Sequence, residues 1–158
     1  MNSTVVVYYS KDNNTRTGAK ILSDRIGAKI VELTEIRKGN FIQALTKKSS
    51  KLAGDPWGEI KDAKIIYLMS PIWASNGVPA VNAFLDKADL TNKEVTIITF
   101  QQFADLRNSD NVHNYFRNKV QDKNGIVLDC YAFLGGKMGH CAEEIYIRTQ
   151  IDKLFPTE

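Results

Sequence analysis

The sequence predicts an α/β protein: a three-layer αβα sandwich around a five-stranded parallel sheet with strand order 2-1-3-4-5. Short apolar runs of strand length alternate, five times along the 158 residues, with segments whose apolar residues recur at helical spacing. Residues 4–9, 63–70 and 94–100 are almost continuously apolar, as expected for central strands buried on both faces. Such alternation implies right-handed crossovers and helices on both sheet faces.

Of the first two strand–helix pairs, the first has a clear helical pattern and the second a weaker one. Residues 4–9 predict a strand, and residues 14–26 predict a helix because Ala19, Leu22 and Ile26 fall on one face. Residues 28–33 predict the second strand. Residues 40–53 predict a weaker helix with a basic, solvated outer face formed by Lys47, Lys48 and Lys51. The segment that follows, 53–62, is rich in turn residues.

The remaining three pairs complete the pattern. A strand at 63–70 precedes a helix at 78–88, with Pro79 in its first turn, where the missing N–H does no harm. A strand at 94–100 precedes a helix at 110–120, whose apolar stripe is Val112, Phe116 and Val120. A strand at 125–134 and a helix at 139–155 close the chain. Without a linker or repeat, residues 1–158 are expected to form one domain.

Composition and charge narrow the function classes. The chain is 43% hydrophobic and 25% charged, with a formal net charge of +3. The basic residues are too scattered for a nucleic-acid interface. No apolar run approaches the ~20 residues of a membrane span, and the N-terminus has no signal-peptide core, so a cytoplasmic location is expected.

The cysteines and histidines do not form a recognisable redox or metal motif. Cys130 and Cys141 are eleven residues apart, too far for a C-x-x-C pair, and are expected to be small buried hydrophobes. His140 has no second ligand pair beside it, and His113 is expected to be an exposed helix residue. Trp57 is expected to serve in packing.

Ligands of such sheets bind outside the carboxyl ends of the strands, where the strand order reverses. The reversal lies between the first and third strands, so the loops after Tyr9, Met69 and Phe100 are candidate site loops. The first, `SKDNNTRT`, offers hydroxyls, amides and the free N–H groups of a starting helix. These features suit a phosphate, but helix capping alone also explains them. Asn13 tolerates the left-handed conformation that a glycine would supply.

The second and third loops offer apolar faces and polar edges. Trp73 in `SPIWASNGVPA` is expected to be partly exposed and to stack on a flat ligand, although ordinary packing is the competing interpretation. The third loop, `TFQQFADLRNSD`, carries Phe103 beside Thr99, Gln101 and Gln102. Aromatic faces with a few edge hydrogen bonds suit a planar heterocycle.

These loops resemble the flavodoxin family. `YYSKDNNTRTGAKIL` is similar to its phosphate loop, of the form S/T-x-T-G-N-T, with Asn13 in the glycine position, and `SPIWASNGVPAVNAFLD` is similar to its second loop and third helix. The resemblance spans essentially the whole chain and implies an FMN-binding domain. The residues that it places around the phosphate are Ser10, Asp12, Asn13, Asn14 and Thr15. Those that it places beside the flavin ring are Pro71, Ile72 and Trp73 on one side and Thr99, Phe100, Gln101, Gln102 and Phe103 on the other.

Other families with related loops fit less well. The first strand ends `YYS` and the third `MSP`, which lack the acidic residues of a receiver domain, and neither G-x-G-x-x-G nor G-x-x-x-x-G-K-[ST] is present. Ser10 and Arg16 have the C-x₅-R spacing of small tyrosine phosphatases, but serine lacks the thiolate.

Two functional hypotheses remain. One is an FMN-dependent redox protein without a catalytic side chain of its own, either a one-electron carrier or a two-electron reductase. Its partner would be a redox protein or a small acceptor such as a quinone, and it could be a monomer or a homodimer. The other is a binding or scaffold protein of the same fold that holds no FMN. Asn13 favours this alternative, as does the third loop, which lacks the glycine and the acidic residue usual in the flavodoxin family.

Overall fold

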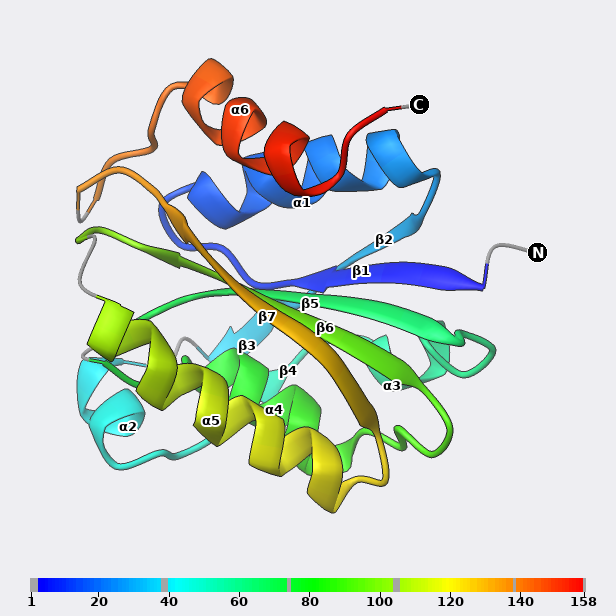
Figure 1. Cartoon of the computed structure of the whole chain (residues 1–158). Helices are drawn as coiled ribbons and strands as arrows, with labels where there is room; N and C mark the ends of the chain where they lie inside the picture. The colour runs from blue at the N-terminus through cyan, green and yellow to red at the C-terminus, as the bar shows by residue number, and fades with distance from the viewer. Residues whose placement is uncertain (1–2, 38–39, 74, 104–105, 138, 158) are drawn as a thin grey trace.

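The structure, a computed structural model, describes residues 3–37, 40–73, 75–103, 106–137 and 139–157. Its main sheet is parallel, with strand order β2-β1-β5-β6-β7, which confirms the predicted order 2-1-3-4-5 for the five main strands (Figure 1). The strands of this sheet are β1 (Thr4–Tyr8), β2 (Lys29–Glu32), β5 (Ile65–Pro71), β6 (Glu94–Gln101) and β7 (Ile126–Leu134).

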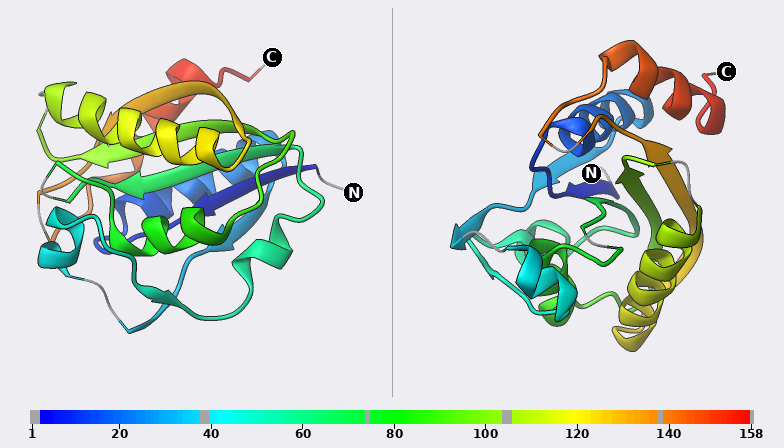
Figure 2. Two further views of the ribbon diagram at one scale, coloured as in Figure 1. Left: turned by 90° about the horizontal axis from the view of Figure 1, so that it is seen from below. Right: turned by 90° about the vertical axis from the view of Figure 1, so that its left-hand side faces the viewer.

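Helices cover both faces of the sheet, as predicted. In Figures 1 and 2, α1 and α6 lie together on one face, and α4 and α5 lie on the other, together with the shorter α2 and α3. The helices are α1 (Asn14–Ile26), α2 (Phe41–Leu45), α3 (Pro56–Glu59), α4 (Pro79–Lys87), α5 (Leu106–Asp122) and α6 (Glu144–Leu154). Among the described residues, none of these helices has the length and apolar character needed to cross a membrane.

Strand register brings three loops together at the carboxyl end of the sheet. Tyr8 on β1 pairs with Met69 on β5, and Met69 pairs with Ile98 on β6. Because the three strands are parallel and aligned in this way, their carboxyl ends lie side by side. The polar segments that follow them therefore meet where the strand order reverses.

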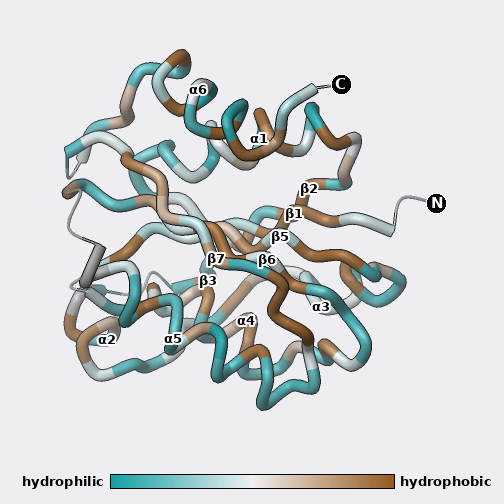
Figure 3. The backbone as a smooth tube through the Cα atoms, viewed as in Figure 1, coloured by the Kyte–Doolittle hydropathy of each residue, from teal (hydrophilic) through white to brown (hydrophobic). Residues whose placement is uncertain are grey.

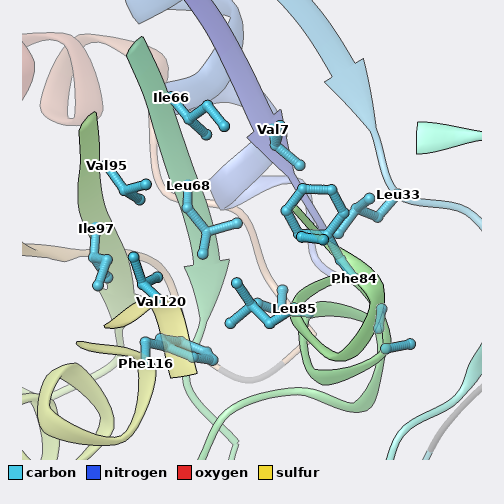
Figure 4. Packing of buried hydrophobic residues seen from close by; sticks show 14 of the residues in the cluster. Val7, Leu33, Ile66, Leu68, Phe84, Leu85, Val95, Ile97, Phe116 and Val120 are labelled. Carbon is cyan, nitrogen blue, oxygen red and sulfur yellow. The ribbon is translucent and has the colours of Figure 1, made fainter. Parts of the chain in front are cut away.

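Two hydrophobic clusters fill the space between the layers. On the α4–α5 face, Phe84 and Phe116 pack against Leu68 and Ile97 (Figure 4). On the α1–α6 face, Leu22 and Ile147 are among the residues that pack against the other side of the sheet. Figure 3 shows the matching pattern along the chain, with hydrophobic central strands and more hydrophilic outer helix faces. Each fully buried large side chain contributes about 1.5–3 kcal/mol.

The predicted helix at 40–53 is wrong beyond its first turns. Only Phe41–Leu45 is helical; the chain then reverses, and β4 (Lys51–Leu52) pairs antiparallel with β3 (Glu35–Arg37). The helix ends where Lys47 adopts a left-handed φ of 54°, which does not continue an α-helix. The basic cluster is exposed, as expected, but it spans a turn and a strand.

Two further expectations are wrong, and both concern side-chain burial. His113 is 8% exposed, because on α5 it shares the sheet-facing side with Val112 and Phe116. Cys141 is exposed and Cys130 half-buried, both as free thiols. Cys141 lies in a loop because α6 begins at Glu144, later than predicted.

Trp57 packs, as expected. Its ring is half-buried against the core of the α4–α5 face. The indole Nε1 donates to the Phe84 carbonyl (2.9 Å), which fixes the short α3 against α4.

Candidate functional site

A cavity of about 270 Å³ opens at the carboxyl ends of β1, β5 and β6. We call it the switch-point pocket. Its walls come from the three loops singled out in the sequence and from the loop after β7. The lining residues are Ser10, Lys11, Asp12, Asn14, Thr15, Pro71, Ile72, Trp73, Ser75, Phe100, Gln101, Gln102, Phe103, Gly135 and Gly136.

The loop after β1 adopts the backbone shape that a glycine would otherwise provide. Asn13, the residue before α1, has φ 65° and ψ −4°, in the left-handed region. Asparagine enters this region at less cost than other side chains do. Asn13 therefore has the left-handed conformation that a glycine at this position would supply, and the loop leads directly into α1.

Asn13 does not cap α1 with its side chain. Its Oδ1 instead accepts a hydrogen bond from Arg16 Nη1, and Arg16 Nη2 forms an ion pair with Glu32 on β2. The first-turn N–H groups of α1 therefore receive no side-chain cap from Asn13, and a helix N-terminus in that state attracts an anion. This arrangement favours anion binding over helix capping, the two interpretations that the sequence left open.

Asn14 and Asp12 hold the loop after β7 against this helix start. Asn14 Oδ1 accepts from the backbone N–H groups of Gly136 (3.0 Å) and Ala142 (2.8 Å), and Asp12 Oδ2 accepts from that of Gly139 (3.0 Å). A Cβ at Gly136 would lie 2.4 Å from the His140 carbonyl oxygen, so this tight loop requires glycine there. Asn14 and Asp12 thus help to form a wall of the pocket.

Two residues that line the pocket each have a buried side-chain oxygen without a hydrogen-bond partner among the described residues. These oxygens are Ser10 Oγ, beside the start of α1, and Gln101 Oε1, at the end of β6. Gln101 is 8% exposed, so its amide oxygen has little access to water. A buried polar atom without a partner costs about 1–3 kcal/mol, which a polar ligand would offset.

Trp73 is buried, at 7% exposure, which corrects the expectation that it is partly exposed. The chain folds back at Asn76, where Trp73 N–H donates to Asn76 O (3.1 Å) and Asn76 N–H donates to Trp73 O (2.8 Å). This turn places the ring edge-on against Tyr9, with 5.9 Å between the centroids. Lys11 Nζ lies 5.1 Å from the centroid of the Trp73 ring, which still lines the pocket.

The third loop supplies the more exposed wall. Phe103 is 64% exposed and lines the pocket, while Phe100 is buried beneath it. The predicted loop continues through residues 104–105, which lie outside the described residues. Beside Trp73, burial and a hydrogen bond with Glu35 raise the pKa of Tyr9 above its usual value.

Most of the predicted site residues line this one pocket. Two of them do not. Asn13 provides the left-handed backbone residue before α1, and Thr99 Oγ1 lies 2.7 Å from Nε2 of the buried His113. The sequence reasoning missed four lining residues, namely Lys11, Ser75, Gly135 and Gly136. The glycine pair follows β7 at the same sheet edge, a signal that could have found it.

The described residues do not support a metal centre in this protein. Within the described ranges, no three His, Cys, Asp or Glu side chains gather closely enough to hold a metal ion. The pocket offers uncharged hydroxyls and amides, one lysine, one aspartate and aromatic rings. That set suits a flat organic ligand that carries an anionic group.

Comparison by sequence finds no matching protein-family model and no matching curated protein. Comparison by structure finds many matches. A putative flavoprotein from Bacteroides uniformis superposes with a TM-score of 0.73 at 15% identity, covering 96% of this chain and 98% of that one. A flavoprotein from Lactobacillus acidophilus, solved in complex with FMN, gives 0.64 at 16% identity, covering 84% and 93%.

A flavodoxin shows the same likeness. Oxidised flavodoxin 2 from Bacillus cereus gives a TM-score of 0.57 at 13% identity, covering 96% of both chains. At these identities the likeness shows the fold alone. Together with the strand order β2-β1-β5-β6-β7, it establishes that this chain has the flavodoxin-like fold.

Proposed function

We propose that the chain binds FMN in the switch-point pocket and acts as a redox protein, passing electrons to a partner protein or reducing a small acceptor. The observation that carries this proposal is the uncapped start of α1 beside the unpartnered Ser10 Oγ. It supports a phosphate at one end of the pocket. The unpartnered Gln101 Oε1 and the Trp73 and Phe103 rings support a flat heterocycle at the other.

Each part of the chain would have a defined role toward FMN. Ser10, Thr15 and the first-turn N–H groups would hold the phosphate through hydrogen bonds and the helix dipole. Gln101 Oε1 would accept a hydrogen bond from an N–H on the edge of the flavin, and the aromatic rings would cover its faces. The flavin itself supplies reversible electron uptake, and the protein supplies binding and orientation.

The same pocket bears on the competing hypothesis of a scaffold that holds no FMN. Asn13 is one of its two supports, beside the third loop, because a Cβ in the glycine position could prevent the phosphate loop from closing. Asn13 adopts the left-handed conformation with its side chain turned to Arg16, so that objection loses its physical basis. We extend the proposal to a cytoplasmic location, where cellular redox partners would meet the flavin.

The test is a titration of the purified chain with FMN and with riboflavin, followed by flavin fluorescence. We expect FMN to bind at micromolar concentration or below and riboflavin to bind at least tenfold more weakly, because riboflavin lacks the phosphate. The Phe103→Ala variant should weaken both ligands similarly. Leu128→Ala, which removes an exposed side chain on β7, should change neither.

Three outcomes would decide between the hypotheses. A colourless protein that binds no FMN at tens of micromolar would overturn the proposal in favour of the scaffold. Equal affinity for FMN and riboflavin would remove the phosphate site from it. If FMN binds, an anaerobic reductive titration distinguishes an electron carrier, reduced in two separate steps, from a two-electron reductase, reduced in one.

A further inference from the structure

A second cavity lies beside the β3–β4 hairpin and shares no residue with the switch-point pocket. Its volume is about 520 Å³, within the range of about 300–1,000 Å³ typical of small-molecule sites. We call it the donor cavity, because each lining side chain carries an N–H or O–H group and none is a carboxylate. The lining residues are Arg37, Asn40, Gln43, Ser49, Ser50 and Lys51.

Two cations face each other across the hairpin. Arg37 on β3 and Lys51 on β4 are paired in the antiparallel register. Like charges directly opposite each other in a sheet are destabilising, by an amount on the scale of about 0.2–1 kcal/mol per pair. Within the described part of the chain, neither side chain has an acidic partner. A bound anion between them would turn this repulsion into attraction.

Among the described residues, the two amides that line the cavity have side-chain N–H groups left to donate. Gln43 N–H donates to Asn40 Oδ1 and Asn40 N–H donates to Gln43 Oε1, each at 3.0 Å, which forms a capping box. Both amide oxygens are therefore occupied as acceptors by backbone groups. The Nδ2 of Asn40 and the Nε2 of Gln43 can only donate.

The two serines differ in their partners. Ser50 Oγ is buried and has no hydrogen-bond partner among the described residues. Ser49 Oγ donates to Asp86, the nearby acid, whose charge is balanced by an ion pair with Lys119. Burial acts to raise the pKa of the Asp86 carboxyl, but the hydrogen bonds from Lys119 and Ser49 outweigh it and keep this pKa below its usual value. Asp86 is thus a compensated charge outside the lining of the cavity.

The backbone around the cavity is fixed to the core. Ser50 N–H donates to the Pro79 carbonyl (3.1 Å), and the buried Asn82 donates through Nδ2 to the Lys48 carbonyl (3.1 Å). These bonds attach the segment before β4 to the start of α4. The backbone on this side of the cavity is therefore held in place by the core, which lowers the ordering cost of binding.

We infer that the donor cavity is an oxyanion site that takes the phosphate group of a small molecule. Two cations, two amide donors and an unpartnered hydroxyl match the charge and the acceptor oxygens of a phosphate. The cavity is larger than one tetrahedral oxyanion needs, so there is room for the organic part of a phosphate monoester. The inference does not depend on FMN binding, because the two sites have separate linings.

The test uses inorganic phosphate and glycerol phosphate as probes, titrated into the full chain at about 0.1 M NaCl and followed by amide chemical shifts in NMR. FMN is present at saturation if the chain binds it, so that the α1 site does not compete. We expect saturable shifts at residues 37, 40, 43 and 49–51. The double variant Arg37→Gln/Lys51→Gln should weaken binding at least tenfold, and Ser50→Ala should weaken it severalfold.

The matched control is Lys20→Gln/Lys153→Gln, which removes the same charge from exposed positions on α1 and α6. It should leave the affinity unchanged. An equal loss in this control would show a general charge effect and overturn the site, as would shifts confined to residues 10–16. Tighter binding of glycerol phosphate than of inorganic phosphate would identify a phosphorylated metabolite as the ligand class, whereas equal binding would identify free phosphate.

Discussion

The two cavities of this protein are formed by different kinds of segment. The switch-point pocket is built by loops that are far apart in the sequence and are brought together by a buried parallel sheet. The donor cavity is lined by six residues that are close together in the sequence, namely Arg37, Asn40, Gln43, Ser49, Ser50 and Lys51. The first pocket mixes aromatic rings with polar groups that include one lysine and one aspartate, whereas every side chain that lines the second carries an N–H or O–H group. The lining of the switch-point pocket is therefore chemically varied, because it comes from loops that are distant in the sequence. The lining of the donor cavity is uniform, because it comes from one short stretch of polar and basic residues.

The largest expected effect tests how far the switch-point pocket depends on the core. Phe116 is fully buried on α5 and supports Gly77, at which a Cβ would lie 2.7 Å from Phe116 Cε1. Phe116→Ala should lower the free energy of unfolding by about 3–5 kcal/mol through the cavity that it leaves. Urea denaturation measures this loss.

The control lies beside the donor cavity. Ile42 on α2 is 71% exposed, and Ile42→Ala should change stability by no more than about 0.5 kcal/mol. Similar losses of stability in the two variants would contradict the burial of Phe116 and the exposure of Ile42.

A close approach under the switch-point pocket gives the next effect. Gly18 on α1 faces Phe100, and a Cβ at position 18 would lie 2.5 Å from Phe100 Cζ. Gly18→Val should cost about 1–3 kcal/mol by overpacking, and it should weaken FMN binding because Phe100 lines the pocket. Thermal unfolding and the FMN titration report the two effects.

Gly27, at the end of the same helix, provides the comparison. It has a φ of 63°, and a Cβ at this position would meet no atom within 4 Å. Gly27→Ala should therefore cost stability through backbone strain alone and leave the affinity for FMN intact. Wild-type stability in Gly18→Val would show that the Phe100 ring moves freely.

Asn13 tests whether the phosphate loop depends on its left-handed residue. Asn13→Ala loses both the hydrogen bond from Arg16 and the tolerance of a positive φ, so we expect it to cost about 1 kcal/mol more than Asn13→Gly, which loses only the hydrogen bond. The alanine variant should also lose more affinity for FMN than for riboflavin. Equal losses for both ligands would separate Asn13 from phosphate binding.

A smaller effect concerns pH. Burial lowers the pKa of His113 below its ordinary value of 6.5, so the unfolded chain binds this proton more readily than the folded one. The stabilisation is complete above about pH 6.5 and is lost as the pH falls from there toward the lowered pKa. His113→Gln should flatten the dependence of stability on pH in this window, as measured by urea denaturation. An unchanged slope would assign the titration to another group.

The difference between the cavities also explains what the sequence could predict. The apolar runs of β1, β5 and β6 determined the sheet, and the sheet determined which loops meet, so eleven of the predicted residues line the switch-point pocket. The burial of Trp73 depends on a backbone turn at Asn76 that no periodicity encodes. The donor cavity escaped prediction because residues 40–53 have a weak helical pattern, and the left-handed Lys47 that ends α2 is a non-glycine exception.

The smallest expected effect tests the repulsion that motivates the donor cavity. Lys51→Glu places a carboxylate opposite Arg37, so the like-charge pair becomes an attractive one. In phosphate-free buffer at low salt, this variant should gain stability of about 0.2–1 kcal/mol, as measured by urea denaturation. When inorganic phosphate is added, it should no longer show NMR shifts at residues 37, 40, 43 and 49–51. Lys153→Glu makes the same charge change on α6 and should do neither. A loss of stability in Lys51→Glu would mean that Arg37 and Lys51 do not repel each other across the hairpin, and the case for an anion between them would fall with that repulsion.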